Sequence, residues 1–168
     1  MPLEQLAHLA EIIAAVAVVM SLIYVGRQLR QNTEMLRVGA AGSWVAVTER
    51  LVSEITTSRE VAEYWLKAGS SSAFDSLDEV DQQRAIMFYW RAITNWNQWF
   101  ELRQKGLMPD PQWNELIWLI QNFGRRHALR EAWRTFEGGY DQSFRDFVSH
   151  HFEEGDRKRE SAASRSTS

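Results

Sequence analysis

The chain has 168 residues, of which 45% are hydrophobic and 24% charged, so most of it is expected to fold as one domain with room for a terminal appendage. Its net charge of −3 argues against nucleic acid as the main partner, because nucleic-acid binding usually requires a basic face. The absence of cysteine excludes disulfides, thiolate metal sites and cysteine nucleophiles.

An apolar run near the N-terminus predicts a transmembrane anchor helix within residues 1–30. Residues 12–26 contain no charged side chain, and extension back to Leu6 gives 21 residues, or about 31 Å of helix. The extension includes Glu11, which lies near the outer end of the span, where water and lipid headgroups can solvate its carboxylate. The aliphatic side chains favour insertion by roughly 2–4 kcal/mol, so the helix can carry one acidic group near its end.

Two other interpretations of this run remain open. A cleaved signal peptide usually starts with positive charge and ends at small residues, whereas this chain starts MPLEQ and its apolar core ends in IYVGRQLR. A buried helix of a soluble bundle is the stronger alternative, because the uncharged core is short and rich in alanine.

Positive charges follow the apolar run but do not precede it, and this asymmetry predicts its orientation. Arg27, Arg30 and Arg37 come directly after the run, and no Lys or Arg comes before it. The positive-inside rule therefore places the N-terminus outside and the remainder of the chain in the cytoplasm. The three arginines are expected to contact anionic lipid headgroups, each worth about 1 kcal/mol near the surface.

Small residues recur along one face of the predicted span at alternating spacings of three and four. This stripe consists of Ala7, Ala10, Ala14, Ala17 and Ser21. Small side chains let helix backbones approach closely inside lipid, where packing drives association. The stripe predicts self-association or docking on another membrane protein, with Glu11 beside it hydrogen-bonded at the interface. The alternative is chance clustering of alanines, which are common in membrane spans.

Beyond the span, apolar residues recur at helical spacing, and only three prolines occur in the chain, which favours long helices. The first such stripe consists of Leu36, Ala40, Trp44, Val47, Leu51 and Ile55. Gly39 and Gly42 are expected to bend this helix. Ser58 is predicted to cap a short helix that ends at Gly69, and the run SSSAFDS after it is predicted to be a linker.

The rest of the chain is expected to complete an all-α bundle over residues 31–152. Ser76 and Glu79 form a capping-box pattern and predict a helix that runs to about Gly106. Further apolar stripes predict three more helices, and no strand pattern of any length occurs. Residues 153–168 contain almost no apolar side chain and are predicted to be a disordered tail.

The helix predicted before Gly106 contains the run FYWRAITNWNQWF, whose aromatic residues occupy more than one face. Its mixture of indoles and polar groups comprises Trp90, Arg91, Asn95, Trp96, Gln98 and Trp99. Such a mixture is typical of the wall of a ligand pocket or of a partner surface. The alternative is that the tryptophans fill the bundle core while the polar groups face water.

No residue pattern in the sequence indicates catalysis. Asp146, His150 and Glu154 share a helical face at metal-ligand spacing, but a histidine four residues from a carboxylate is also an ordinary helix pair. The glycines match neither a phosphate loop nor a dinucleotide fingerprint, and the serines lie in no nucleophile motif. We expect no metal, no cofactor and no enzymatic activity.

Several stretches resemble a widespread family of uncharacterised bacterial single-span membrane proteins. In that family a glutamate-led apolar helix runs into a Q-x-R-Q-N-T-like exit, as residues 11–33 do here apart from one extra Ile. The other similar stretches are LDEVDQQR from Leu77, GLMPDPQW from Gly106, REAW from Arg130 and FRDFV from Phe144. The resemblance covers nearly all of residues 6–152 and implies an anchor in a bacterial inner membrane with a cytoplasmic helical domain. It implies no particular activity.

These features predict a non-enzymatic, single-pass inner-membrane protein. We expect it to act as an oligomeric scaffold or as an accessory subunit of a membrane complex. Its predicted partners are membrane lipid and either a second copy or another membrane protein, and not nucleic acid. The alternative is a membrane-tethered sensor whose aromatic-rich bundle binds a small apolar ligand or lipid.

Overall fold

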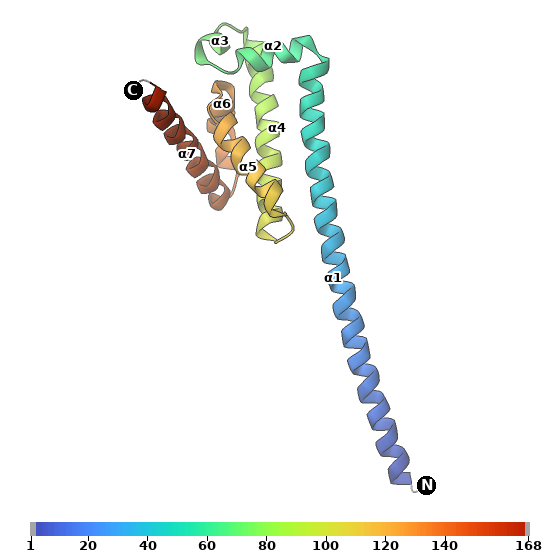
Figure 1. Ribbon diagram of the computed structural model, residues 1–168. Helices are drawn as coiled ribbons and strands as arrows, with labels where there is room; N and C mark the ends of the chain where they lie inside the picture. Colours follow the sequence, from blue (N-terminus) through green and yellow to red (C-terminus); the bar gives the residue numbers. More distant parts are fainter. Residues whose placement is uncertain (1–2, 167–168) are drawn as a thin grey trace. The chain divides into compact units, whose positions relative to one another are not determined.

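The computed structural model describes residues 3–166, which are helical throughout most of their length and contain no strand (Figure 1). This confirms the all-α prediction. The helices are α1 (Leu3–Thr57), α2 (Arg59–Lys67), α3 (Ser71–Asp75), α4 (Glu79–Gln104), α5 (Asp110–Phe123), α6 (His127–Phe136), the short 3₁₀ helix η1 (Glu137–Gly139) and α7 (Gln142–Ser166).

The chain divides into two compact units, an N-terminal unit of Met1–Gly39 and a C-terminal unit of Ala40–Ser168. The division falls later than the predicted anchor boundary at residue 30, because residues 31–39 continue α1 as an exposed helix. Helix α1 passes through Gly39 and Gly42 without interruption, since a glycine inside a helix costs only about 1 kcal/mol.

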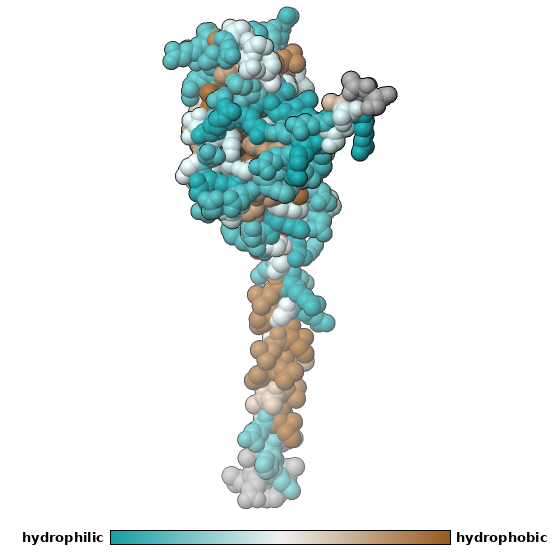
Figure 2. Space-filling model, turned by 90° about the vertical axis from the view of Figure 1, so that its left-hand side faces the viewer, coloured by the Kyte–Doolittle hydropathy of each residue, from teal (hydrophilic) through white to brown (hydrophobic). Residues whose placement is uncertain are grey.

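The N-terminal unit is an exposed stretch of α1. Every residue whose burial is described between positions 5 and 39 is exposed. Figure 2 shows hydrophobic residues gathered along this part of α1, on the face that is viewed. The hydrophobic side chains of this unit therefore have no cover within the described chain.

The C-terminal unit has a continuous apolar core with α4 running through it. Helix α4 packs against α6, and α5 packs against α7. The buried indole of Trp44 brings α1 into the core, with its ring centroid 4.1 Å from that of Trp99 and the two rings tilted by 45°. The largest fully buried side chains are Ile93, Leu116, Ile120, Leu129, Phe144 and Val148. Because they come from α4, α5, α6 and α7, this core holds the four helices in one body.

Local side-chain hydrogen bonds cap the first turns of α2 and α4. Ser58 caps α2 as predicted, since its hydroxyl accepts the amide N–H of Val61 at 3.3 Å. The cap of α4 is Asp78, whose Oδ1 accepts the N–H of Asp81 at 2.8 Å. The capping box predicted from Ser76 is wrong, because the Ser76 hydroxyl donates instead to the carbonyl of Ala73 at 2.7 Å. The preceding predicted linker contains the short helix α3.

Helix α7 continues to Ser166, so the structure differs from the predicted disordered tail over residues 153–166. The extra turns pack on the bundle. Gly155 is buried against α5, where an added Cβ would lie 2.4 Å from the carbonyl oxygen of Gln121. Beside it, Arg130 Nη2 pairs with Asp156 Oδ2 at 2.9 Å. Residues 167–168 lie outside the described chain.

Candidate functional site

The N-terminal unit exposes an apolar surface that is unusual for a helix in water. Ile12 is 61% exposed and Leu22 is 67% exposed. Among residues 3–166, α1 is the one helix long and apolar enough to cross a membrane, and no residue of its apolar window is buried. A core helix of a soluble bundle would be largely covered by other helices. No part of residues 3–166 covers this window, so it does not match the buried bundle helix that is the main alternative to a membrane span.

The predicted helix-association residues lie on this exposed segment. Ala10, Ala14, Ala17 and Ser21 are all exposed, and the side chain of Ala7 lies outside the described residues. The Ser21 hydroxyl donates to the carbonyl of Ala17 at 2.9 Å, so it needs no partner from another helix. The carboxylate of Glu11 lies 3.6 Å from Nδ1 of His8, and both side chains are more than four-fifths exposed.

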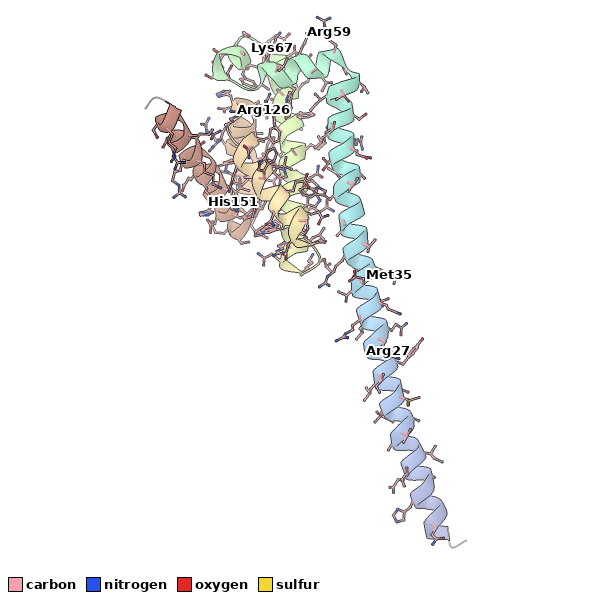
Figure 3. All side chains as sticks on the ribbon, viewed as in Figure 1. Arg27, Met35, Arg59, Lys67, Arg126 and His151 are labelled. Atoms are coloured by element: carbon pink, nitrogen blue, oxygen red, sulfur yellow. The ribbon has the colours of Figure 1, made fainter. Side chains whose placement is uncertain are left out.

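The predicted headgroup-binding arginines also lie in the N-terminal unit. Arg27, Arg30 and Arg37 are exposed, and Figure 3 shows the Arg27 side chain extending away from α1. Arg37 Nη1 lies 3.8 Å from the carboxylate of Glu34, in an exposed pair worth less than about 1 kcal/mol. These positions leave all three guanidinium groups accessible.

The aromatic residues predicted on α4 divide between the core and its edge. Trp96 and Trp99 are buried at 4% and 3% exposure, whereas Trp90 is half-buried, with its ring 5.0 Å from that of Phe136. Gln98 is exposed. The six residues therefore do not form one surface.

A cavity of about 210 Å³ lies inside the C-terminal unit, between α1 and α4. Its walls are apolar and aromatic side chains from α1, α2, α4, α5 and α6, including the buried Trp96 and Trp99. It borders Val52, which is 53% exposed. Two polar residues line it, Thr48 from α1 and Asn95 from α4. Asn95 was predicted from the sequence as part of a ligand surface, whereas the contribution of α1 was not.

Helix α1 is held to α4 by a charge pair next to this cavity. Arg91 donates through Nη1 to Glu54 Oε1 at 3.2 Å and through Nη2 to Glu54 Oε2. This two-point hydrogen bonding by Arg91 lowers the pKa of the Glu54 carboxyl below its usual value. Arg91, predicted as a ligand or partner residue, is thus engaged in joining two helices.

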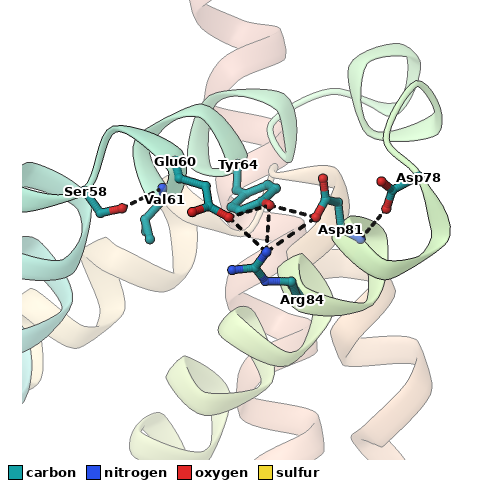
Figure 4. A network of polar contacts seen from close by, with 7 residues as sticks. All are labelled: Ser58, Glu60, Val61, Tyr64, Asp78, Asp81 and Arg84. Carbon is teal, nitrogen blue, oxygen red and sulfur yellow. Dashed lines mark hydrogen bonds and ion pairs between the residues drawn. The ribbon is translucent and has the colours of Figure 1, made fainter.

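A polar network lies between α2 and the first turns of α4 (Figure 4). Two of its members, Tyr64 and Arg84, line a second cavity of about 350 Å³. The Tyr64 hydroxyl lies 2.7 Å from Asp81 Oδ1 and 3.1 Å from Glu60 Oε1, while Arg84 Nη1 donates to Glu60 at 3.0 Å. Hydrogen bonding to Asp81 raises the pKa of Tyr64 to about 12. Because the guanidinium and the hydroxyl satisfy both carboxylates, this network joins α2 to α4 and offers no free base.

A further cluster joins α6 to the core. The Cζ atom of Arg126 lies over the Trp65 ring, 4.0 Å from its centroid, and the Nε of Arg126 donates to the Tyr89 hydroxyl. Burial raises the pKa of Tyr89 to about 12. No sequence spacing signals this cluster, because its members come from α2, from α4 and from the residue that precedes α6.

The candidate metal ligands are arranged differently from the sequence prediction. His150, His151 and Glu154 place ligand atoms within 4.8 Å of one another, whereas the Asp146 carboxylate accepts a hydrogen bond from Gln142 at 2.6 Å.

The cluster around Glu154 is already neutralised. Lys158 Nζ lies 3.1 Å from Glu154 Oε1, Gln121 Nε2 donates to Glu154 Oε2 at 2.7 Å, and His151 Nδ1 lies 3.3 Å from the same oxygen. An ammonium beside the carboxylate opposes the approach of a metal cation. This geometry describes an ion pair within α7 that is hydrogen-bonded to Gln121 of α5.

Comparison of the chain with protein-family models, with curated proteins and with solved structures finds no match in any of the three.

Proposed function

We propose that the protein is a non-enzymatic, single-pass inner-membrane protein that acts as an oligomeric scaffold or as an accessory subunit of a membrane complex. The observation that carries this proposal is the apolar window of α1, none of which is buried. Exposed apolar patches of this extent mark membrane or protein interaction sites, because leaving them in water is unfavourable.

The charges around the window support one orientation. Arg27, Arg30 and Arg37 follow it, and no Lys or Arg precedes it. This asymmetry favours an outside N-terminus and a C-terminal unit in the bacterial cytoplasm, with the arginines at the inner headgroups.

The pattern of α1 supports self-association. Val38, Val45 and Val52 are 65%, 50% and 53% exposed and recur every seven residues. In the sequence they share a heptad register with Ala10 and Ala17 of the small-residue stripe. A straight helix drifts about 20° per heptad, so a seam in this register implies left-handed coiling around a partner helix. A second copy of α1 supplies such a partner.

Crosslinking inside the membrane tests the assembly. The chain has no cysteine, so Ala10→Cys introduces a unique thiol in the stripe. We expect disulfide-linked dimers in this background. Adding Ala14→Leu should lower the crosslinked fraction about tenfold, which corresponds to about 1.4 kcal/mol of lost helix packing.

The matched control is Ala15→Leu, which makes the same change one residue away and off the stripe. It should crosslink like the parent. If Ala14→Leu also crosslinks like the parent, the small-residue stripe is not the interface.

A second candidate function is a membrane-tethered sensor whose bundle binds a small apolar ligand. The cavity of about 210 Å³ in the C-terminal unit favours it, because ligand sites are mostly apolar hollows with a few placed polar groups. This function differs from the first in requiring a ligand.

A further inference from the structure

The cavity between α1 and α4 is lined by two polar side chains for which residues 3–166 provide no hydrogen-bond partner. Thr48 and Asn95 both line it, and neither side chain hydrogen-bonds with another residue of the described chain. Both residues are half-buried, so their polar atoms are partly removed from bulk water. A hydroxyl and an amide each donate and accept, so together they suit a ligand group that does both.

The remaining lining determines the charge of a ligand that fits. None of the residues lining this cavity is charged, and most are aliphatic or aromatic. Moving an ion into such surroundings is costly without a countercharge, so a neutral ligand is favoured. Arg91 and Glu54 lie close by but are paired with each other.

The volume determines the size of the ligand. An apolar cavity of about 150 Å³ is sufficient to bind benzene. The cavity here measures about 210 Å³, which leaves room for one ring and a short polar substituent.

We propose that this cavity binds a small neutral alcohol with an aromatic or similarly compact apolar body, its hydroxyl hydrogen-bonded by Asn95 and Thr48. This inference rests on the second candidate function and gives that function a ligand class. The ligand hydroxyl donates a hydrogen bond to the amide oxygen of Asn95, and the Thr48 hydroxyl or the Asn95 amide N–H donates to the ligand oxygen. The apolar body lies against Trp96 and Trp99.

The position of the cavity also gives ligand binding a structural consequence. Two contacts join α1 to α4 next to the cavity: the ring of Trp44 packs against that of Trp99, which lines the cavity, and Glu54 pairs with Arg91. Side chains of both helices line the cavity. A bound alcohol adds contacts between the two helices and stabilises their association.

Quenching of tryptophan fluorescence by brominated probes tests the proposal on the full chain in lipid nanodiscs. All eight tryptophans lie at Trp44 or later, so a probe that only enters the bilayer around residues 12–26 stays away from them. The probes are 4-bromobenzyl alcohol and 4-bromotoluene, which differ in the hydroxyl. We expect saturable quenching by both, with the alcohol binding more tightly.

Three variants separate the site from non-specific partitioning. Asn95→Leu should weaken the alcohol about threefold to tenfold, the effect of one hydrogen bond, without weakening 4-bromotoluene. Ala92→Leu fills the cavity and should abolish saturable quenching by both probes. Ala46→Leu, on the exposed side of α1, is the matched control and should bind like the parent.

Circular dichroism of each variant establishes that the helices are intact. Non-saturable quenching, or quenching that survives in a folded Ala92→Leu variant, overturns the site. Equal affinity of Asn95→Leu and the parent for the alcohol overturns the ligand class.

The crosslinked fraction of Ala10→Cys, measured with and without the alcohol, tests the sensor function separately from the binding site. If the alcohol binds but changes neither the assembly nor the stability of the protein, the proposed site stands and the sensor function is rejected.

Discussion

His151 illustrates how single residues stabilise the C-terminal unit. Its side chain is 12% exposed between α7 and α5, beside Gln121, Glu154 and Lys158. Burial lowers the pKa of the imidazole, and the hydrogen bond to Glu154 raises it by a smaller amount. The folded protein therefore favours the neutral imidazole, whereas the unfolded chain takes up a proton near pH 6.5.

This difference predicts a pH-dependent stability. Below pH 6.5 the unfolded chain binds more protons at His151 than the folded chain does, so the free energy of unfolding falls as the pH falls through this range. For one proton the slope is at most about 1.4 kcal/mol per pH unit. Denaturant titrations at pH 7.5 and pH 5.5 should show a larger loss for the parent than for His151→Gln.

The His151→Gln variant keeps a hydrogen-bonding side chain that does not titrate. The pKa values of the Glu54 and Glu154 carboxyls are lowered, so the stability that these groups contribute to the protein is lost only at more acidic pH. They therefore do not account for a change in stability between pH 7.5 and pH 5.5. Identical pH slopes for the parent and the variant would show that His151 does not carry the effect.

Helices α5 and α7 approach each other closely at Gly155. A Cβ on Gly155 would lie 2.4 Å from the carbonyl oxygen of Gln121 and 3.0 Å from its Cα. Backbone atoms cannot rotate aside as a flexible side chain can, so α7 must shift to accommodate even a methyl group.

Gly155→Ala is therefore expected to lower the free energy of unfolding by about 1 kcal/mol or more, despite the better helix propensity of alanine. Gly138→Ala is the control, because an added Cβ there meets nothing within 4 Å. Thermal and denaturant melts of the two variants provide the comparison. A Gly155→Ala protein as stable as the parent would mean that α7 does not pack on α5 as described.

Helices whose signals are local could be predicted from the sequence, and those held by distant contacts could not. The Ser58 cap depends on a hydrogen bond three residues away, and the prediction is confirmed. The extension of α7 depends on Gln121 and Arg130, which are more than twenty residues from their partners, so the tail composition alone was misleading. The cavity could not be predicted, because it depends on how side chains from α1, α2, α4, α5 and α6 leave space between them.

The whole molecule combines an exposed apolar helical segment with a bundle that has its own core. The N-terminal unit buries nothing within the described chain, whereas the C-terminal unit buries aromatic side chains from most of its helices. In the proposed function a bilayer covers the first unit, and the charge asymmetry around residues 12–26 favours one direction of crossing. We therefore propose a single span with the arginines and the bundle on the inner side.

Labelling of single cysteines in intact bacterial spheroplasts tests this claim most directly. The cysteine-free chain allows one thiol before the window, Gln5→Cys, and one in the bundle, Ser70→Cys, both at exposed positions. A membrane-impermeant maleimide should label Gln5→Cys in intact spheroplasts and Ser70→Cys only after permeabilisation. Labelling of both positions from the same side, or of Ser70→Cys alone from outside, would contradict the proposed span or its direction.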